Sequence, residues 1–420
     1  MKRKLFFLER VIYGSGDTAF NVVVPVKISG SFPAEHLGMA LGSLQEKHPF
    51  LKAFIRHDEK QMPWFVVDTA AYNPIPVRIV QRNSDQDWQA EVTREWATLF
   101  DVDQGPLMRV VWIKGEQRAE LLLVMHHCVC DGRSAMSILA DLLVLLDNPA
   151  ANIGRENPIL SIQDIVPAKL LKSKRKVLQA KLSGGVTALV LWLMPLRKQM
   201  TERKQDYMLN WKMDQAWSDH LIKVAKSAGL TVNTLLCKTV LTAFKDVISG
   251  DFHNKIICPV DIRKYVPLIR DENIFAFVSM VVLSASSRLS FMEDAAKMQQ
   301  DVARKMENLD PYAMLMQMEA SHASLSGLTK FLKFSKPGSD CLFSNLGKIG
   351  IPHQYQTFEV DTIYSPSAVG PLGKTTGIVA STYRGQMDFT FISSEGFLPY
   401  EEAVRIKDRV IDIISKITVD

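Results

Sequence analysis

The stretch that decides the fold of this chain is VMHHCVCDGRS, residues 124–134. Two histidines, His126 and His127, close an apolar run, and an Asp-Gly pair follows four residues after the second histidine. The apolar run predicts a β-strand, in which consecutive side chains point to opposite faces. Only one imidazole can therefore face a given cavity, and we expect the other to be a hydrogen-bonded histidine in the packing behind it.

The residues after the histidines predict a turn and then a helix. Asp131 and Gly132 end the strand, and SAMSILADLLVLL, residues 134–146, predicts a helix with Ser134 near its cap. A histidine at a strand end, beside a turn and a helix N-terminus, occupies a common position for a site. Because the pKa of free histidine is about 6.5, this one can act as a general base. Asp131 would either orient it or fix the turn through a buried ion pair.

Other interpretations of the motif stay open. Four neighbouring side chains can ligate a metal: His126, His127, Cys128 and Cys130. Neighbouring strand residues diverge, however, and no second cluster of cysteine and histidine completes four ligands, so we expect no metal. A cysteine nucleophile lacks an obvious partner. A satisfied histidine pair in the core, without a catalytic role, is the plainest alternative.

The first half of the chain mixes strand and helix patterns. A strand is predicted over 20–30, and a helix from about Pro33 with Ser31 as its cap. One face of that helix is apolar and comprises Leu37, Ala40, Leu41 and Leu44. A short strand over 49–56 follows. The segments 106–113 and 118–125 then predict a hairpin that runs directly into the two histidines.

The second half repeats this mixture. It predicts a helix over 231–248 capped near Thr231 or Asn233, strands over 255–263 and 275–286, a hairpin at Arg384-Gly385, and a last helix from Pro399. We therefore expect an α/β fold with two sandwich domains of similar size rather than one doubly wound sheet. The expected division is a first lobe over 1–167, a connector over 168–204 and a second lobe over 205–420.

The connector 168–204 is strongly basic. It contains one acidic residue, Glu202, and ten basic residues: Lys169, Lys172, Lys174, Arg175, Lys176, Lys181, Arg197, Lys198, Arg203 and Lys204. The whole chain carries only +5, so the rest of it is negative overall. The favoured interpretation is a solvated connector whose apolar part packs on the body. The alternative is a patch that contacts an anionic membrane surface or an acidic partner.

Composition limits the class of protein. The chain has 420 residues, of which 47% are apolar and 23% charged, as in ordinary globular proteins. A net charge of +5 is too weak to indicate nucleic-acid binding. Five scattered cysteines do not form a disulfide framework, and the first apolar run, Leu5 to Leu8, is too short for a signal peptide. We expect a cytoplasmic monomer, with membrane contact only through 168–204.

The motif also has a family resemblance. HHCVCDG, residues 126–132, matches the HHxxxDG signature of the condensation-domain and chloramphenicol-acetyltransferase-like acyltransferase superfamily. Five further segments resemble that superfamily in the same order: LERVIYGSGDTAFNV (8–22), LGMALGSLQEKHPFLKAFI (37–55), LFDVDQGPLMRVVWI (99–113), CPVDIR (258–263) and LFSNLGKIG (342–350). The chain looks most similar to the polyketide-associated and alcohol or wax-ester-type acyltransferases. The DFGWG signature of the plant branch is absent, and the spacer Cys-Val-Cys is unusually rich in thiols.

The resemblance implies a fold and a set of roles. Two chloramphenicol-acetyltransferase-like domains would form a V with a tunnel between them, and His127 would remove a proton from the acceptor inside it. Asp131 would be structural and pair with Arg263 of the second domain. Ser344 and Asn345 would line the tunnel near the developing oxyanion, and Gly347 would permit a close backbone approach.

The implied activity is acyl transfer from a thioester, either acyl-CoA or an acyl-carrier protein, to a hydroxyl or amine. A lipid or polyketide alcohol is the preferred acceptor, and no cofactor or metal is required. The first alternative is a free-standing peptide condensation enzyme that joins carrier-bound substrates. The second is a homologue that binds an acyl carrier or another protein without catalysis.

Overall fold

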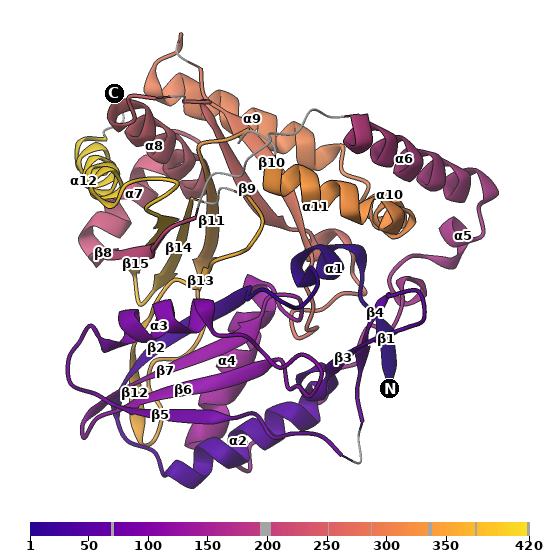
Figure 1. Ribbon diagram of the computed structural model, residues 1–420. Coiled ribbons are helices and arrows are strands. Elements are labelled where there is room, and N and C mark those ends of the chain that lie inside the picture. The colour runs from indigo at the N-terminus through magenta and orange to yellow at the C-terminus, as the bar shows by residue number, and fades with distance from the viewer. Residues whose placement is uncertain are drawn as a thin grey trace.

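The computed structural model describes residues 1–68, 71–193, 203–250, 252–286, 288–334, 338–373 and 376–417. Its two lobes are each built on a six-stranded mixed sheet, and a small third sheet flanks the first lobe. Figure 1 shows the N-terminal lobe below and the C-terminal lobe above. This architecture confirms the predicted α/β fold of two layered lobes.

The N-terminal sheet has the order β12-β2-β7-β6-β5, and β13 also pairs with β2. Helix α2 packs against α4, and α3 lies against β2. Both faces of the sheet are covered, so Val22, Val23 and Val24 of β2 are all buried. The bounds are β2 Asn21–Gly30, α2 Ala34–Lys47, β5 Val77–Gln81, α3 Asp87–Ala97, β6 Met108–Lys114, β7 Arg118–His126, α4 Gly132–Asp147, β12 Phe358–Ile363 and β13 Ser367–Ala368.

The small sheet lies beside the N-terminus and has the order β1-β4-β3. Its elements are β1 Lys2–Lys4, α1 Phe7–Tyr13, the 3-10 helix η1 Pro49–Lys52, β3 Phe54–His57 and β4 Pro63–Val66. The stretch 49–56, predicted as one strand, is therefore split into η1 and β3. Pro49 lacks a backbone N–H and suits the first turn of a helix, which explains the difference.

The C-terminal sheet has the order β10-β9-β11-β14-β15-β8. Helix α12 packs against α8 beside this sheet, while α10 and α11 pack against α6 of the connector. The bounds are β8 Asp206–Met213, α7 Gln215–Ser227, α8 Val232–Val247, β9 Lys255–Asp261, η3 Arg263–Tyr265, β10 Val278–Ser284, α9 Phe291–Glu307, α10 Pro311–Ala320, η4 His322–Ser324, α11 Leu325–Phe334, β11 Cys341–Lys348, β14 Gly377–Tyr383, β15 Gln386–Ser394 and α12 Tyr400–Lys416.

Two strands from the second half of the chain belong to the sheet of the first lobe. Strands β12 and β13 lie within the range 205–420 that the sequence prediction gave to the second lobe, yet both pair with β2 of the first. Phe358 stands opposite Gly30, and Ile363 opposite Val26. An alternating pattern predicts a strand but carries no information about which sheet accepts it. The second half of the chain therefore completes the first lobe.

Several local predictions are confirmed and others are wrong. The side chain of Thr231 caps α8, and the turn Arg384-Gly385 has positive φ at both residues, 51° and 78°, as a two-residue hairpin requires. Helix α2, by contrast, begins at Ala34 with Pro33 at its N-cap position and no side-chain cap, so Ser31 is not its cap. The cap of α4 is Asp131 rather than Ser134.

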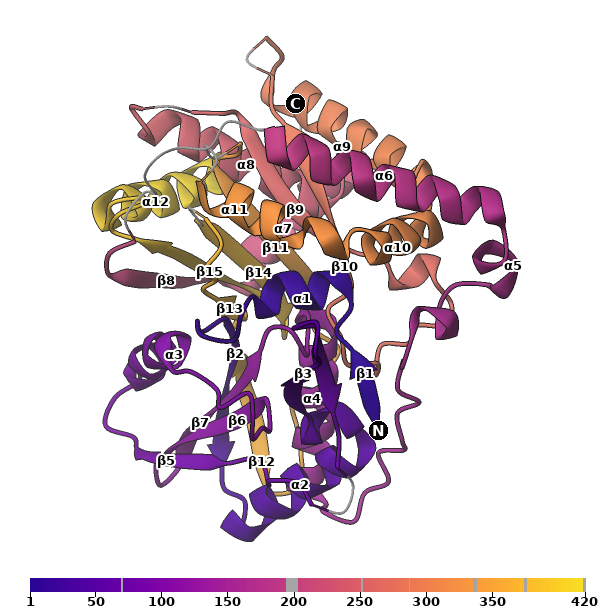
Figure 2. The same cartoon turned by 45° about the vertical axis from the view of Figure 1, so that its right-hand side comes forward.

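The connector forms 3-10 helix η2 Ile162–Asp164, short helix α5 Ala168–Leu171 and then α6 Lys174–Leu193. Figure 2 brings α6 to the front, where it crosses α10 and α11. The rest of the predicted connector, including Arg197 and Lys198, lies partly outside the described residues. Among the helices that the structure describes, none combines the length and the apolar character needed to cross a bilayer.

Candidate active site

His126 is the last residue of β7 and is buried. Its Nδ1 accepts a hydrogen bond from the backbone N–H of Cys128 at 3.2 Å, and its ring lies 6.2 Å from the rings of Tyr13 and Phe100. Burial lowers the pKa of His126 to about 4, so its imidazole is neutral at pH 7. This histidine belongs to the packing of the first lobe.

His127 lies in the turn after β7 and is partly exposed. Its backbone N–H donates to the carbonyl of Phe20 at 2.8 Å, and the two rings meet edge to face at 5.0 Å. Its Nδ1 lies 2.8 Å from the carbonyl oxygen of Cys130. A carbonyl oxygen can only accept, so Nδ1 carries the hydrogen and Nε2 holds a free lone pair in the neutral ring.

The protonation state of His127 favours a base. Burial lowers its pKa, and this effect outweighs the hydrogen bond to Cys130 and the charge of Asp131, which both raise it. The imidazole is therefore neutral at pH 7. It combines an unprotonated Nε2 with partial exposure, which is what a proton acceptor requires.

Asp131 caps α4 and at the same time connects the lobes. Its Oδ1 accepts from the backbone N–H groups of Arg133 and Ser134 at 3.1 and 3.0 Å. Its Oδ2 accepts from Arg263 Nη1 at 2.7 Å and from the backbone N–H of Phe277 at 3.0 Å, and Arg263 Nη2 reaches Oδ1 at 3.1 Å. Arg263 and Phe277 belong to the second lobe, so this carboxylate holds the two lobes together.

The guanidinium of Arg263 is buried and fully charged. It also donates to the Asp261 carboxylate and to the carbonyl of Phe275, both at 3.3 Å. Burial would lower the pKa of Arg263, but Asp131 and Asp261 outweigh that effect and raise it. The Asp131 carboxylate is thus occupied by Arg263 and backbone N–H groups, while Nδ1 of His127 is engaged with Cys130. The geometry favours the ion-pair role of Asp131 over the triad role.

Gly132 brings the HHxxxDG turn against the segment LFSNLGKIG, residues 342–350, of the second half of the chain. A Cβ at Gly132 would lie 2.7 Å from Cδ2 of Leu346, so the start of α4 lies directly against β11. Ser344, Asn345 and Gly347 all belong to β11, which has a bulge between Asn345 and Lys348. The two motifs, more than 200 residues apart, therefore meet at the lobe junction.

Gly347 adopts a left-handed backbone conformation, and the close backbone approach expected of it in the tunnel stays a prediction. Its φ is +69°, and a Cβ there would meet nothing within 4 Å. The left-handed conformation, rather than close approach within the chain, explains this glycine. The backbone N–H of Gly347 donates to Asn345 Oδ1 at 2.8 Å, which fixes the amide of Asn345, and the partly exposed Ser344 precedes it.

The thiols of the motif are poor nucleophiles. Cys128 and Cys130 are buried, and burial raises the pKa of both thiols well above the ordinary value. Within the described ranges, no three side chains of histidine, cysteine, aspartate and glutamate come together as metal ligands.

Sequence reasoning missed the backbone partners of the site. The carbonyl of Cys130 selects the tautomer of His127, and the N–H of Phe277 completes the shell around Asp131. Backbone groups have no residue-type signal. Residues 275–278 were predicted only as the start of a strand, and the tertiary fold was needed to place the N–H of Phe277 beside Asp131.

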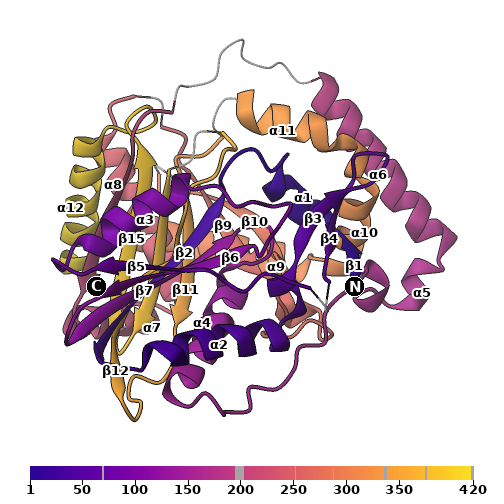
Figure 3. The same ribbon diagram turned by 60° about the horizontal axis from the view of Figure 1, so that its bottom comes forward.

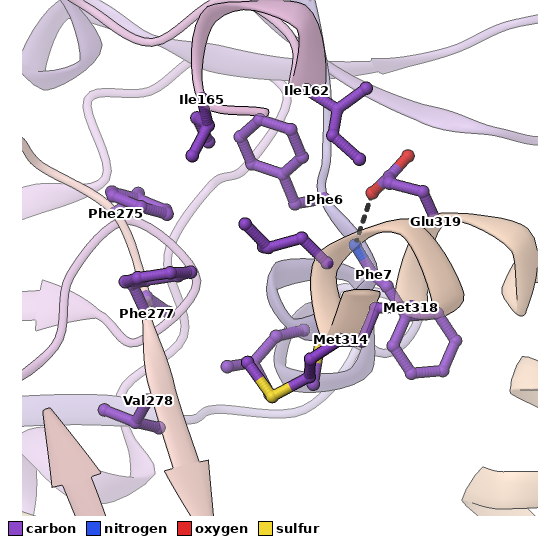
Figure 4. A pocket seen from close by; sticks show the side chains of 13 residues that line it. Phe6, Phe7, Ile162, Ile165, Phe275, Phe277, Val278, Met314, Met318 and Glu319 are labelled. Carbon is purple, nitrogen blue, oxygen red and sulfur yellow. Dashed lines mark hydrogen bonds between the residues drawn. The ribbon is translucent and has the colours of Figure 1, made fainter. Parts of the chain in front are cut away.

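A small apolar pocket lies next to the contact between Asp131 and Phe277, and Phe277 is one of its lining residues. Its volume is about 20 Å³, little more than the room that one water molecule needs. Phe275, Phe277 and Met314 line it, with Glu319 at its edge accepting from the N–H of Phe7 at 3.2 Å (Figure 4). His127 is not among its lining residues. The expected tunnel past His127 therefore stays a prediction.

The chain has two lobes with an HHxxxDG turn at their junction, and its fold is shared by solved acyltransferases and condensation domains. Residues 2–310 match the family model of the Condensation domain, and the chain belongs to that family. This confirms the resemblance inferred from the sequence. Membership supports a transferase activity.

Solved structures agree at the level of the fold. The chain is similar to the trichothecene 15-O-acetyltransferase of Fusarium sporotrichioides, with a TM-score of 0.75, 14% identity and coverage of 98% of this chain and 95% of that one. It is also similar to polyketide synthase associated protein 5 of Mycobacterium tuberculosis, with a TM-score of 0.69, 14% identity and coverage of 99% and 98%.

Sequence relatives include peptide synthetases. The plipastatin synthase of Bacillus subtilis (strain 168) includes a polypeptide that is 22% identical over 253 residues, which are 59% of this chain. The chain spans 10% of the length of that relative.

Proposed function

We propose that the protein transfers an acyl group from a thioester to a hydroxyl or amine acceptor, with His127 as general base. One observation carries the proposal. The bond from Nδ1 of His127 to the Cys130 carbonyl leaves Nε2 of a neutral, partly exposed imidazole unprotonated at the lobe junction. Such a base typically contributes about 10²–10⁴-fold to the rate.

In the proposed step, Nε2 accepts the acceptor's O–H or N–H proton while the heteroatom attacks the thioester carbonyl carbon. The carbon–sulfur bond then breaks, the sulfur leaves with the electron pair, and the imidazolium returns its proton to the thiolate. The ester or amide and a free thiol result, and His127 is neutral again. Every proton is accounted for by His127, so the proposed route uses no cofactor or metal.

The remaining site residues have supporting roles in this proposal. The Asp131–Arg263 pair holds the turn that carries His127, because it caps α4 and binds the second lobe. The oxygen of Asn345 is occupied by the N–H of Gly347, which leaves the side-chain NH₂ to donate. We propose that this NH₂, with the Ser344 hydroxyl, stabilises the oxyanion.

The preferred donor is acyl-CoA or an acyl-carrier protein, and the preferred acceptor is a lipid or polyketide alcohol. The fold likeness to a 15-O-acetyltransferase supports ester formation. The second candidate is condensation of two carrier-bound substrates, which the Condensation family match and the peptide synthetase relatives favour.

The test is acyl transfer from a panel of acyl-CoA and acyl-carrier donors, followed by release of free thiol. His127→Ala is expected to lower kcat by about 10²–10⁴-fold. The matched control is His57→Gln, an exposed histidine on β3. Full activity of His127→Ala would refute the base assignment. Transfer only between two carrier-bound substrates would establish the second candidate, and binding without transfer would leave a non-catalytic homologue.

A further inference from the structure

Helix α6 has two apolar faces, of which one is covered. The covered face packs against α10 and α11: Ala180 is buried, and a Cβ at Gly184 would lie 3.0 Å from the carbonyl oxygen of Ala320. The other face carries six apolar side chains that are 45 to 65% exposed, namely Leu178, Leu182, Val186, Leu189, Val190 and Leu193. We call these six side chains the α6 stripe.

The α6 stripe is continuous along the helix. At 3.6 residues per turn, its members fall within an arc of about 120° and extend for about 22 Å. Single exposed apolar residues are ordinary on protein surfaces, but a contiguous apolar strip marks an interaction site. A helix that is apolar on both faces is normally covered on both, and no described part of this chain covers the stripe.

Positive charge surrounds the α6 stripe. Residues 168–193 contain no acidic residue and six basic ones: Lys169, Lys172, Lys174, Arg175, Lys176 and Lys181. Of these six, only Lys176 has an acidic partner within 4 Å in the described structure, Asp310 at 3.6 Å. By helical geometry, Lys174 and Lys181 flank one edge of the stripe, Lys176 flanks the other, and Arg175 lies in line with it at the N-terminal end.

We propose that α6 lies on the surface of an anionic membrane, with the α6 stripe in the boundary between headgroups and acyl chains. An apolar helix face bordered by lysine and arginine is the pattern of helices that lie in this plane. The basic residues then approach lipid phosphates, each contributing about 1 kcal/mol near an anionic surface. The position of α6 on the outer edge of the molecule, seen in Figure 1 and Figure 3, leaves this face accessible to a flat surface.

A lipid surface suits this face better than a second copy of the chain. In a symmetric dimer the same patch meets itself, so the positive charges of the unpaired lysines and arginine would lie opposite positive charges and repel each other. A lipid partner also fits the composition of the stripe, since all six side chains are leucine or valine, whereas protein interfaces concentrate their binding energy in tryptophan, tyrosine and arginine.

The test is co-sedimentation of the full chain with phosphatidylcholine vesicles, with and without phosphatidylglycerol. We expect binding that requires phosphatidylglycerol and weakens as salt rises, because salt screens the charges. Lys174→Gln with Arg175→Gln should weaken binding about 25-fold, or about fivefold per charge. Leu182→Gln with Leu189→Gln should weaken it about tenfold or more.

The matched control is Ile222→Gln with Lys223→Gln on α7, an exposed apolar and a basic residue on another face. This control should bind vesicles as the wild type does. Absence of vesicle binding, or binding unchanged in both α6 variants, would refute the proposal. So would a dimer of the wild type in solution that Leu182→Gln with Leu189→Gln dissociates, because the stripe would then belong to a second copy.

Discussion

His126 and His127 are adjacent in the chain but are held as opposite tautomers. His126 accepts a backbone N–H at Nδ1, so its hydrogen is on Nε2, whereas His127 donates from Nδ1 to a carbonyl, so its lone pair is on Nε2. Burial lowers the pKa of both rings. Two imidazoles of the same kind thus acquire different chemistry from two backbone contacts, and only His127 is prepared to accept a proton.

The pH dependence of activity follows from the lowered pKa of His127. A general base must be unprotonated, so activity falls only when the pH drops through its pKa in the folded protein. We expect the acid limb of kcat/KM to be centred below pH 6.5, the ordinary pKa of histidine. A pH profile of thiol release measures this. An acid limb centred above pH 6.5 would contradict the assigned environment of His127.

Arg263→Ala is expected to destabilise the fold by about 3–5 kcal/mol, because it leaves the buried Asp131 carboxylate without its charged partner. Denaturant unfolding measures the loss. Removing both charges, with Asp131→Asn and Arg263→Met together, should cost less than the single change.

The control for this prediction is Arg384→Ala. Arg384 pairs with Glu359 on the surface, where both side chains are 40% exposed, and such pairs contribute about 0–1 kcal/mol. If Arg263→Ala and Arg384→Ala lowered the free energy of unfolding equally, the buried inter-lobe pair would contribute no more to stability than a surface pair.

The surroundings of His48 predict that its contribution to the free energy of unfolding depends on pH. It is buried between Glu156, at 2.8 Å from Nδ1, and Asp141, at 3.4 Å from Nε2, while Glu156 also accepts from the N–H of Ile274 in the second lobe. Burial lowers the pKa of His48, but the hydrogen bonds to the two carboxylates outweigh it and raise the pKa above 6.5. The stabilisation from charged His48 is therefore complete below pH about 6.5 and is lost as the pH rises through the folded-state pKa.

The measurement is the free energy of unfolding of wild type and His48→Gln between acid and alkaline pH. The difference between the two proteins should shrink as the pH rises above 6.5. His57→Gln, at an exposed position, serves as the control and should show no such trend. A difference that grows with pH would mean that His48 is neutral in the folded protein.

Two neighbouring glycines of α6 should respond differently to alanine. A Cβ at Gly185 meets nothing within 4 Å, so Gly185→Ala should stabilise by about 1 kcal/mol through helix propensity. At Gly184 the Cβ would press on the carbonyl of Ala320 at 3.0 Å, and we expect this contact to cancel or reverse the gain. Unfolding free energies and the rate of proteolysis within α6 test both changes, and equal effects would contradict the packing of α6 on α10.

Much of the local structure was predictable from the sequence. The alternation over 20–30, the hairpin into the histidines, the Thr231 cap and the last helix all appear where the pattern placed them. The HHxxxDG spacing and its ordered companions were sufficient to identify the family. Periodicity and turn residues carry this information because they report the conformation of a few neighbouring residues and the side that avoids water.

Partnerships across the fold were decided only by the tertiary structure. Strand β12 joins β2, the carbonyl of Cys130 sets the proton position on His127, and the N–H of Phe277 reaches Asp131. The apolar residues of 168–193 were expected to pack on the body, yet only one face of α6 does so. The sequence shows which residues avoid water. Backbone N–H and C=O groups, however, are chemically the same for nearly every residue type, and a hydrophobic pattern does not specify which distant segment it packs against. Contacts between distant segments exist only once the chain has folded.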